Sequence, residues 1–146
     1  MQEIRKDDDM VRTIVHDTLI LRKKSAEANS EDVQIAKDLA DTLEYHKQGC
    51  VGMAANMIGV HKRIIAFYEN GKIVTMFDTE IVSKSQPYET TEGCLSLVGE
   101  PRPVTRYKSI KVRYKDRYMK SHEKRYSGVT AQIIQHETDH CDGILI

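Results

Sequence analysis

Near its C-terminal end the sequence carries His136-Glu137-Thr138-Asp139-His140, inside a stretch, residues 127–143, with the apolar spacing of a helix. Residues four apart lie one above the other on a helix face, so both imidazoles can reach one metal ion. Glu137, one step round the helix, can then approach a water on that metal. A solvent-exposed helix with two ordinary histidines is the alternative, and the preceding run Val129–Ile134 favours the metal site.

A catalytic zinc-type site needs a third protein ligand, which in the common metalloproteases with this motif lies downstream. Only six residues follow His140 here, and Cys141 and Asp142 lie on the same turn. We therefore expect the ligand upstream, which excludes the metzincin pattern and leaves an unrelated zinc endopeptidase as a weak alternative. Cys94 is favoured because Gly93 lets the backbone turn its thiolate inward. The residues alone leave seven candidates open: Cys50, Cys94, His16, His46, His61, His122 and Glu123.

The bulk composition excludes several classes of protein. Lys+Arg and Asp+Glu both number 22, so no basic excess indicates a partner such as nucleic acid or a membrane surface. No apolar run approaches the roughly 20 residues of a membrane span, and the start is too charged for a signal peptide, so we expect a cytoplasmic protein. Three cysteines without a CxxC pair argue against a disulfide framework. At 146 residues we expect one domain, residues 1–146.

The order of predicted elements indicates an α+β fold. We expect mostly antiparallel strands packed around a central metal-binding HExxH helix, with an N-terminal amphipathic helix over residues 30–49. Asn70-Gly71 is a strong hairpin signal. Along the last helix we expect Val129, Ile133 and Ile134 to be core residues rather than pocket lining. The predicted strands cover residues 63–69, 72–77, 109–114 and 118–126.

Three segments together resemble the motifs of the peptide deformylases, which read GxGxAAxQ, EGCLS and QHExDH. Here they are Cys50–Met57, Glu92–Ser96 and Gln135–His140, the second and third complete. The order and spacing also agree, and the resemblance extends from about Asp17 to Ile146. The whole chain is thus identified as a single peptide-deformylase-like domain.

The resemblance implies a metal-dependent hydrolase of protein biosynthesis, which removes the formyl group from the N-terminal formylmethionine of nascent peptides. Glu137 would act as general base on the metal-bound water and pass the proton to the leaving amine. The backbone N–H of Leu95 would be one hydrogen-bond donor to the oxyanion. Met57 falls at the position where the family has its second donor. The metal ligands would be Cys94, His136 and His140, and the substrate contacts Gly52, Met53, Glu92, Gly93 and Arg106.

The cofactor implied is one divalent metal, Fe²⁺ natively, with Zn²⁺, Ni²⁺ or Co²⁺ as substitutes. The partners implied are N-formylated nascent peptides, with the ribosome as a second expected partner. Many deformylases continue past the last motif with a C-terminal helix. This sequence stops at Ile146, so we expect any ribosome docking by that extension to be missing.

The first motif departs from the family at two positions. Met57 replaces the glutamine whose amide helps to hold the oxyanion, and a thioether has no proton to donate. Asn56 is adjacent but is expected to point elsewhere, and Cys50 replaces the first glycine.

Two further departures lie outside the first motif. Asp78-Thr79 replaces the usual Asn-Pro, and Pro101 replaces an arginine. We therefore keep an alternative function: a paralogue with weak or no deformylase activity that binds metal and formylated or other acylated peptides.

Overall fold

The computed structural model describes residues 3–6 and 9–146 and has two antiparallel sheets. A two-stranded sheet pairs β1 (Glu3–Lys6) with β2 (Asp9–Arg12). A five-stranded sheet follows chain order with every neighbour antiparallel, which confirms the mostly antiparallel α+β class. Its strands are β3 (Gly52–Ala54), β4 (Ile64–Glu69), β5 (Lys72–Cys94), β6 (Leu97–Lys115) and β7 (Ser121–Ser127).

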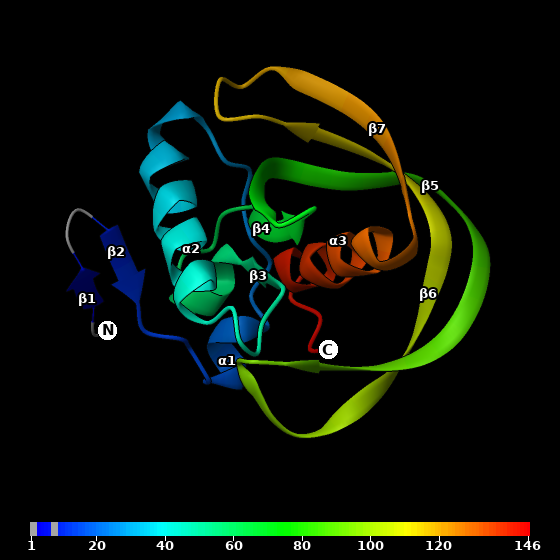
Figure 1. Ribbon diagram of the computed structural model, residues 1–146, viewed down its shortest axis with the longest axis horizontal. Coiled ribbons are helices and arrows are strands. Elements are labelled where there is room, and N and C mark those ends of the chain that lie inside the picture. The colour runs from blue at the N-terminus through cyan, green and yellow to red at the C-terminus, as the bar shows by residue number, and fades with distance from the viewer. Residues whose placement is uncertain (1–2, 7–8) are drawn as a thin grey trace.

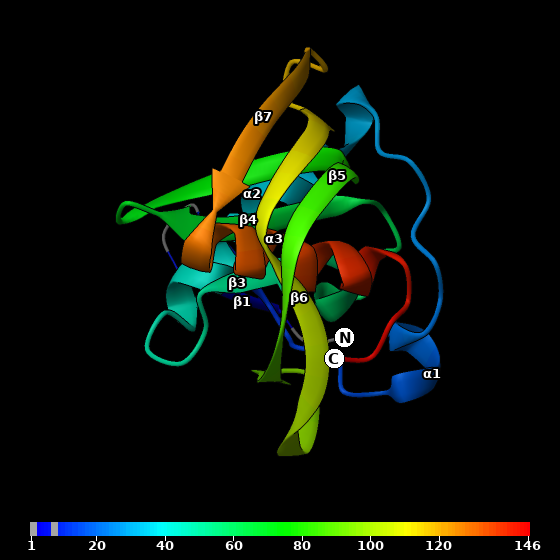
Figure 2. The same cartoon turned by 90° about the vertical axis from the view of Figure 1, so that its right-hand side faces the viewer.

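Three α-helices and two 3-10 turns complete the described structure. Figure 1 shows β5, β6 and β7 curving around α3, while α2 lies on the other side of the molecule with the β1–β2 hairpin outside it. Turned by 90°, the same strands pass across α3 (Figure 2). The helices are α1 (Thr18–Leu21), α2 (Val33–Tyr45) and α3 (Gly128–Cys141), and the 3-10 turns are Ser30–Asp32 and Ala55–Ile58.

Strand β4 separates two hydrophobic clusters because its side chains alternate between the two faces of the sheet. Ile64 and Ala66 pack in the cluster that contains the buried face of α2. Ile65 and Phe67 pack in the cluster that contains Ala131 and Ile134 of α3. These four β4 side chains are fully buried, so α3 packs against one face of the sheet in the interior of the molecule.

The turn between β4 and β5 agrees with its sequence signal. Asn70 and Gly71 have φ values of 53° and 78°, and Glu69 pairs directly with Lys72, as in a two-residue hairpin. Residues 78–94 and 97–108 were not predicted as strand. The register shifts between Phe77 and Glu80, and the exposed ribbon beyond has no apolar alternation to mark it.

A capping box opens the 3-10 turn Ser30–Asp32, which leads directly into α2. Asn29 accepts the N–H of Glu31, and Asp32 accepts the N–H of Asn29, so the first turn is 3-10 and α2 begins at Val33. Within residues 3–6 and 9–146 no helix has the length and apolar character needed to cross a membrane.

Candidate metal centre and pocket

The long β5 strand brings Cys94 to the face of α3 that carries the two histidines. One ligand atom each of Cys94, His136 and His140 lies within 4.8 Å of the others, and this is the one such group found in the described part of the chain. The two Nε2 atoms of His136 and His140 are 3.0 Å apart. Of the seven upstream candidates, the structure brings Cys94 to the histidine pair.

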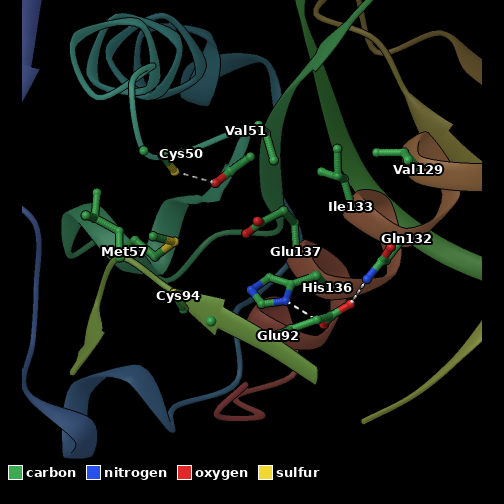
Figure 3. Close-up of a pocket in the computed structure, with 14 residues that line it drawn as sticks. Cys50, Val51, Met57, Glu92, Cys94, Val129, Gln132, Ile133, His136 and Glu137 are labelled. Atoms are coloured by element: carbon green, nitrogen blue, oxygen red, sulfur yellow. Dashed lines mark hydrogen bonds and ion pairs between the residues drawn. The ribbon is translucent and has the colours of Figure 1, made fainter. Parts of the chain in front are cut away.

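A buried carboxylate orients His136. Oε1 of Glu92 lies 2.8 Å from Nδ1 of His136, which leaves Nε2 of that ring facing His140. Gln132 donates to Oε2 of Glu92 at 2.8 Å, and Figure 3 shows Glu92 between these two side chains. Arg106 donates to both Glu92 oxygens and to Asp139. Burial raises the pKa of Glu92, but the hydrogen bonds from His136, Arg106 and Gln132 lower it to about 2, so the carboxylate stays charged.

The two histidines have opposite electrostatic surroundings. Burial lowers the pKa of His140 to about 3, with the charges of His136 and Arg106 acting in the same direction, so its imidazole is neutral and able to bind a metal. Burial also lowers the pKa of His136, but hydrogen bonds with Cys94 and Glu92 raise it to about 10. A cation that binds to this trio therefore displaces a proton, as thiolate and imidazole ligands require.

Glu137 is buried beside the trio with one oxygen unused. Its residue is 4% exposed, its Oε1 has no hydrogen-bond partner in the described structure, and burial raises its pKa to about 7. Gly52 leaves the room for it, because a Cβ there would lie 2.7 Å from Cγ2 of Ile133 and 3.0 Å from Oε2 of Glu137. Two imidazoles, a thiol and an unpaired carboxyl oxygen fit a divalent cation with a water beside it.

A cavity of about 280 Å³ opens onto this group (Figure 3). Val51, Leu95 and Val129 are exposed at it, so its mouth is apolar. Its lining includes the predicted Gly52, Met57, Glu92, Gly93, Leu95 and Glu137. The sequence had not indicated Gly49, Val51 or Gln132 as pocket residues. The full lining is Gly49, Cys50, Val51, Gly52, Met57, Glu92, Gly93, Cys94, Leu95, Val129, Gln132, Ile133, His136 and Glu137.

Two predicted substrate contacts lie elsewhere. Met53 follows Gly52 on β3, so alternation turns its side chain to the opposite face, where it is fully buried in the α2 cluster. Arg106 is 3% exposed, and its guanidinium pairs with Glu92 and Asp139, so it stabilises the Glu92 carboxylate without lining the pocket. Neither side chain lines the pocket, so the expectation that these residues contact substrate stays a prediction.

The expectations for α3 are also corrected in part. Ile134 is fully buried in the core as expected. Val129 is 72% exposed and lines the pocket, and Ile133 lines it too, so neither is a pure core residue. The reason is that α3 faces the sheet on one side only, and the first two turns of its other side form the pocket wall.

The altered first motif takes a defined conformation. Met57 lines the pocket, and its Sδ accepts the N–H of Ala54 at 3.5 Å, so it presents no donor. Asn56 points the other way and donates to the carbonyls of Leu21 and His140. It therefore cannot replace the missing glutamine. Cys50 donates its thiol to the carbonyl of Gly52 at 3.0 Å, and burial raises its pKa to about 12.

The departure at Asp78-Thr79 connects the β5 bulge to α3. Thr79 shares a hydrogen bond with Thr138 of α3, the two Oγ1 atoms being 3.2 Å apart, and Arg63 donates to the Thr79 carbonyl at 2.8 Å. Asp78 has a φ of 54° and accepts the N–H of Ala28 at 2.7 Å. Asp78-Thr79 thus makes its own tertiary contacts where an Asn-Pro pair was expected.

Several known proteins have a sequence and a fold similar to those of this chain. Residues 9–146 match the family described as polypeptide deformylase. A peptide deformylase from Clostridium beijerinckii is 49% identical over 137 residues, which cover 94% of this chain and 100% of that protein. One from Thermoanaerobacter pseudethanolicus is 37% identical over 129 residues, or 86% of this chain and 80% of that one. A crystal structure of a peptide deformylase from Legionella pneumophila superimposes with a TM-score of 0.83 at 32% identity, over 92% of this chain and 83% of that chain. The chain belongs to the peptide deformylase family.

Proposed function

We propose that this chain removes the formyl group from N-terminal formylmethionine, with Glu137 as the general base. The observation that carries the proposal is the position of Glu137: a buried carboxylate with an unpaired oxygen, between Gly52 of the pocket and the Cys94–His136–His140 group. Membership of the family supports a metal-dependent amide hydrolase. The assignment of roles to single residues is ours.

Cys94, His136 and His140 would hold one divalent metal, with α3 as the metal-binding helix of the domain. A thiolate with two imidazoles suits Fe²⁺, which we propose as the native metal, and also Zn²⁺, Ni²⁺ or Co²⁺. When bound, the metal supplies Lewis acidity to the formyl oxygen and acidifies water. Glu92 keeps the His136 ring turned so that Nε2 is the ligand atom.

Proton transfer falls to Glu137. Its free carboxylate oxygen takes a proton from the attacking water and delivers it to the nitrogen of the leaving amine as the C–N bond breaks. Burial excludes bulk water from this carboxylate, and Gly52 allows a substrate backbone to approach it. One base and one Lewis acid are sufficient for hydrolysis of a formamide.

Oxyanion stabilisation is reduced in this chain. The backbone N–H of Leu95 is the donor we assign, and Met57 occupies the second position without a proton to give. Loss of one such donor typically costs about 10²- to 10³-fold in kcat. We therefore propose a slow deformylase rather than an inactive paralogue, because Glu137 and the three ligand side chains are all in place.

The pocket supports a first residue with an apolar side chain. Val51, Val129 and Ile133 offer apolar surface to a methionine side chain, and Gly52 and Gly93 border the path of its backbone. The substrates proposed are formylated nascent peptides, which would place the reaction in the cytoplasm with the ribosome nearby.

Formate release by metal-loaded protein tests this proposal. The chain is loaded anaerobically with Fe²⁺, mixed with a formyl-Met peptide, and compared with Glu137→Gln, which keeps the size of the side chain and removes the base. Glu137→Gln should bind one equivalent of metal and lose turnover by at least about 10²-fold. Equal turnover in both proteins would exclude Glu137 as the base, and metal binding without turnover in either would favour the peptide-binding paralogue.

A further inference from the structure

Asn56 ties three separate segments together in the centre of the molecule. It is fully buried in the 3-10 turn Ala55–Ile58, and its Nδ2 donates to two backbone carbonyls. One belongs to Leu21, the last residue of α1, at 3.2 Å, and the other to His140, at 3.0 Å. The residue is thus bound to the backbone of a proposed metal ligand 84 positions away in the sequence.

The His140 ring lacks the second hydrogen bond that orients most histidine ligands. Its Nδ1 is buried and has no partner in the described structure, whereas Nδ1 of His136 is held by Glu92. Metal-binding histidines usually donate this second nitrogen to a carboxylate or carbonyl, which fixes the ring. The position of His140 therefore depends on its backbone and on packing.

That backbone lies where a helix is least constrained. Helix α3 ends at Cys141, one residue after His140, and the last carbonyls of a helix have no partner within it. The His140 carbonyl is satisfied twice, by the N–H of Gly143 at 3.0 Å and by Asn56. The second bond comes from a buried, well-packed turn and fixes the end of α3 against the first motif.

We propose that Asn56 is a positioning residue for the metal centre, which holds His140 in register with His136 and Cys94 through the His140 carbonyl. The proposal rests on the proposed role of His140 as a metal ligand. It assigns to the first motif a function in metal binding, in addition to its place in the pocket wall. Removal of Asn56 should weaken metal binding about 10-fold, as does removal of other groups that orient metal ligands.

The test compares Asn56→Leu with Thr42→Val by thermal unfolding with and without Co²⁺. Leucine keeps the branched four-atom outline of the Asn56 side chain, with somewhat larger terminal groups, and removes both hydrogen bonds. Thr42 is also fully buried and makes two hydrogen bonds, with Arg12 and Asp38, but lies on α2 away from the centre. Both variants should lower the Tm without metal. The increase in Tm on addition of Co²⁺, which reports affinity, should decrease in Asn56→Leu and stay unchanged in Thr42→Val.

Two further measurements complete the experiment. If Asn56→Leu does not fold, Asn56→Ser, whose shorter hydroxyl can still donate, takes its place. The Co²⁺ affinity of Asn56→Ser should lie below that of the wild type and of Thr42→Val. The visible Co²⁺ spectrum should shift in the Asn56 variants, since it reports the arrangement of ligands around the ion. An unchanged Co²⁺-dependent rise in Tm and an unchanged spectrum in the Asn56 variants would overturn the proposal. No Co²⁺-dependent rise in the wild type would instead refute the metal centre itself.

Discussion

Oε1 of Glu92 lies 2.8 Å from Nδ1 of His136, and the same carboxylate receives Arg106 and Gln132. The middle motif therefore supplies Cys94 at the centre and, two residues earlier, the group that orients one of the histidines. Arg106, which the sequence placed with the substrate, keeps this carboxylate charged. The end of β5 therefore carries the proposed ligand Cys94, the carboxylate that orients His136 and part of the pocket wall.

Glu92→Ala should weaken both metal binding and folding. His136 would lose the partner that fixes its ring, and the buried Arg106 would lose one of its two carboxylate partners. We expect metal affinity to decrease about 10- to 100-fold and the free energy of unfolding to decrease by about 3–5 kcal/mol. Titration with Co²⁺ and urea unfolding measure the two effects. Glu89→Ala, on the exposed side of the same strand, is the control and should change neither by a comparable amount.

The same carboxylate should make the stability of the metal-free protein depend on pH. Because folding lowers the pKa of Glu92 from 4.5 to about 2, its contribution is present above pH 4.5 and is lost as the pH falls toward 2. The difference in unfolding free energy between the wild type and Glu92→Gln should therefore shrink between pH 6 and pH 3. Urea unfolding at both pH values tests this, with the exposed Glu44→Gln as a reference. A constant difference would contradict the assigned environment of Glu92.

Gly52→Ala should abolish most turnover. The added methyl would lie 2.7 Å from Cγ2 of Ile133 and 3.0 Å from Oε2 of Glu137, so the catalytic carboxylate or the β3 backbone has to move. A displacement of about 1 Å near a reacting group can cost about 10²-fold in rate. Gly49 also lines the pocket, but a methyl added there would have nothing within 4 Å, so Gly49→Ala should retain its activity. Similar rates for the two variants would show that Gly52 is not needed for close approach.

Gly143→Ala should destabilise the fold more than Gly71→Ala. Both glycines have positive φ, 76° and 78°, so the conformational cost of alanine, about 1–2 kcal/mol, is common to the two. At Gly143 the methyl would also lie 2.2 Å from the carbonyl oxygen of Arg22, whereas at Gly71 nothing lies within 4 Å. We expect an additional loss of about 1–3 kcal/mol at Gly143. Urea unfolding of both variants measures it, and equal losses would contradict the close packing of the C-terminal segment on α1.

Patterns that depend on local chemistry could be predicted from the sequence. The Asn70-Gly71 turn has the dihedral angles that its residues favour, and the proposed ligands come together because the spacing of His136 and His140 matches a helix turn. The long ribbon formed by β5 and β6 could not be predicted in this way. It is an exposed pair of strands with bulges, and its polar residues carry no periodic signal.

The errors in the predicted site have a common physical origin. Met53 lies in the first motif and Arg106 lies outside the three motifs, and whether either side chain faces the pocket depends on strand alternation and on distant partners. Val129 and Ile133 look like core residues in a helical pattern, and they line a pocket because no strand covers that part of α3. Asn56 was correctly expected to point away from the oxyanion position, but its bonds to Leu21 and His140 need the tertiary structure to be seen. The single-domain expectation stays a prediction.

The most direct test of the account is formate release by the wild type beside Met57→Gln, each loaded anaerobically with Fe²⁺ and given a formyl-Met peptide. The account predicts slow turnover by the wild type and an increase in kcat toward about 10²-fold or more in Met57→Gln, because an amide restores the second oxyanion donor. Met57→Leu, which fills the same space without a donor, should remain at the wild-type rate. No formate from the wild type with one equivalent of metal bound, or no gain in Met57→Gln over Met57→Leu, would contradict it.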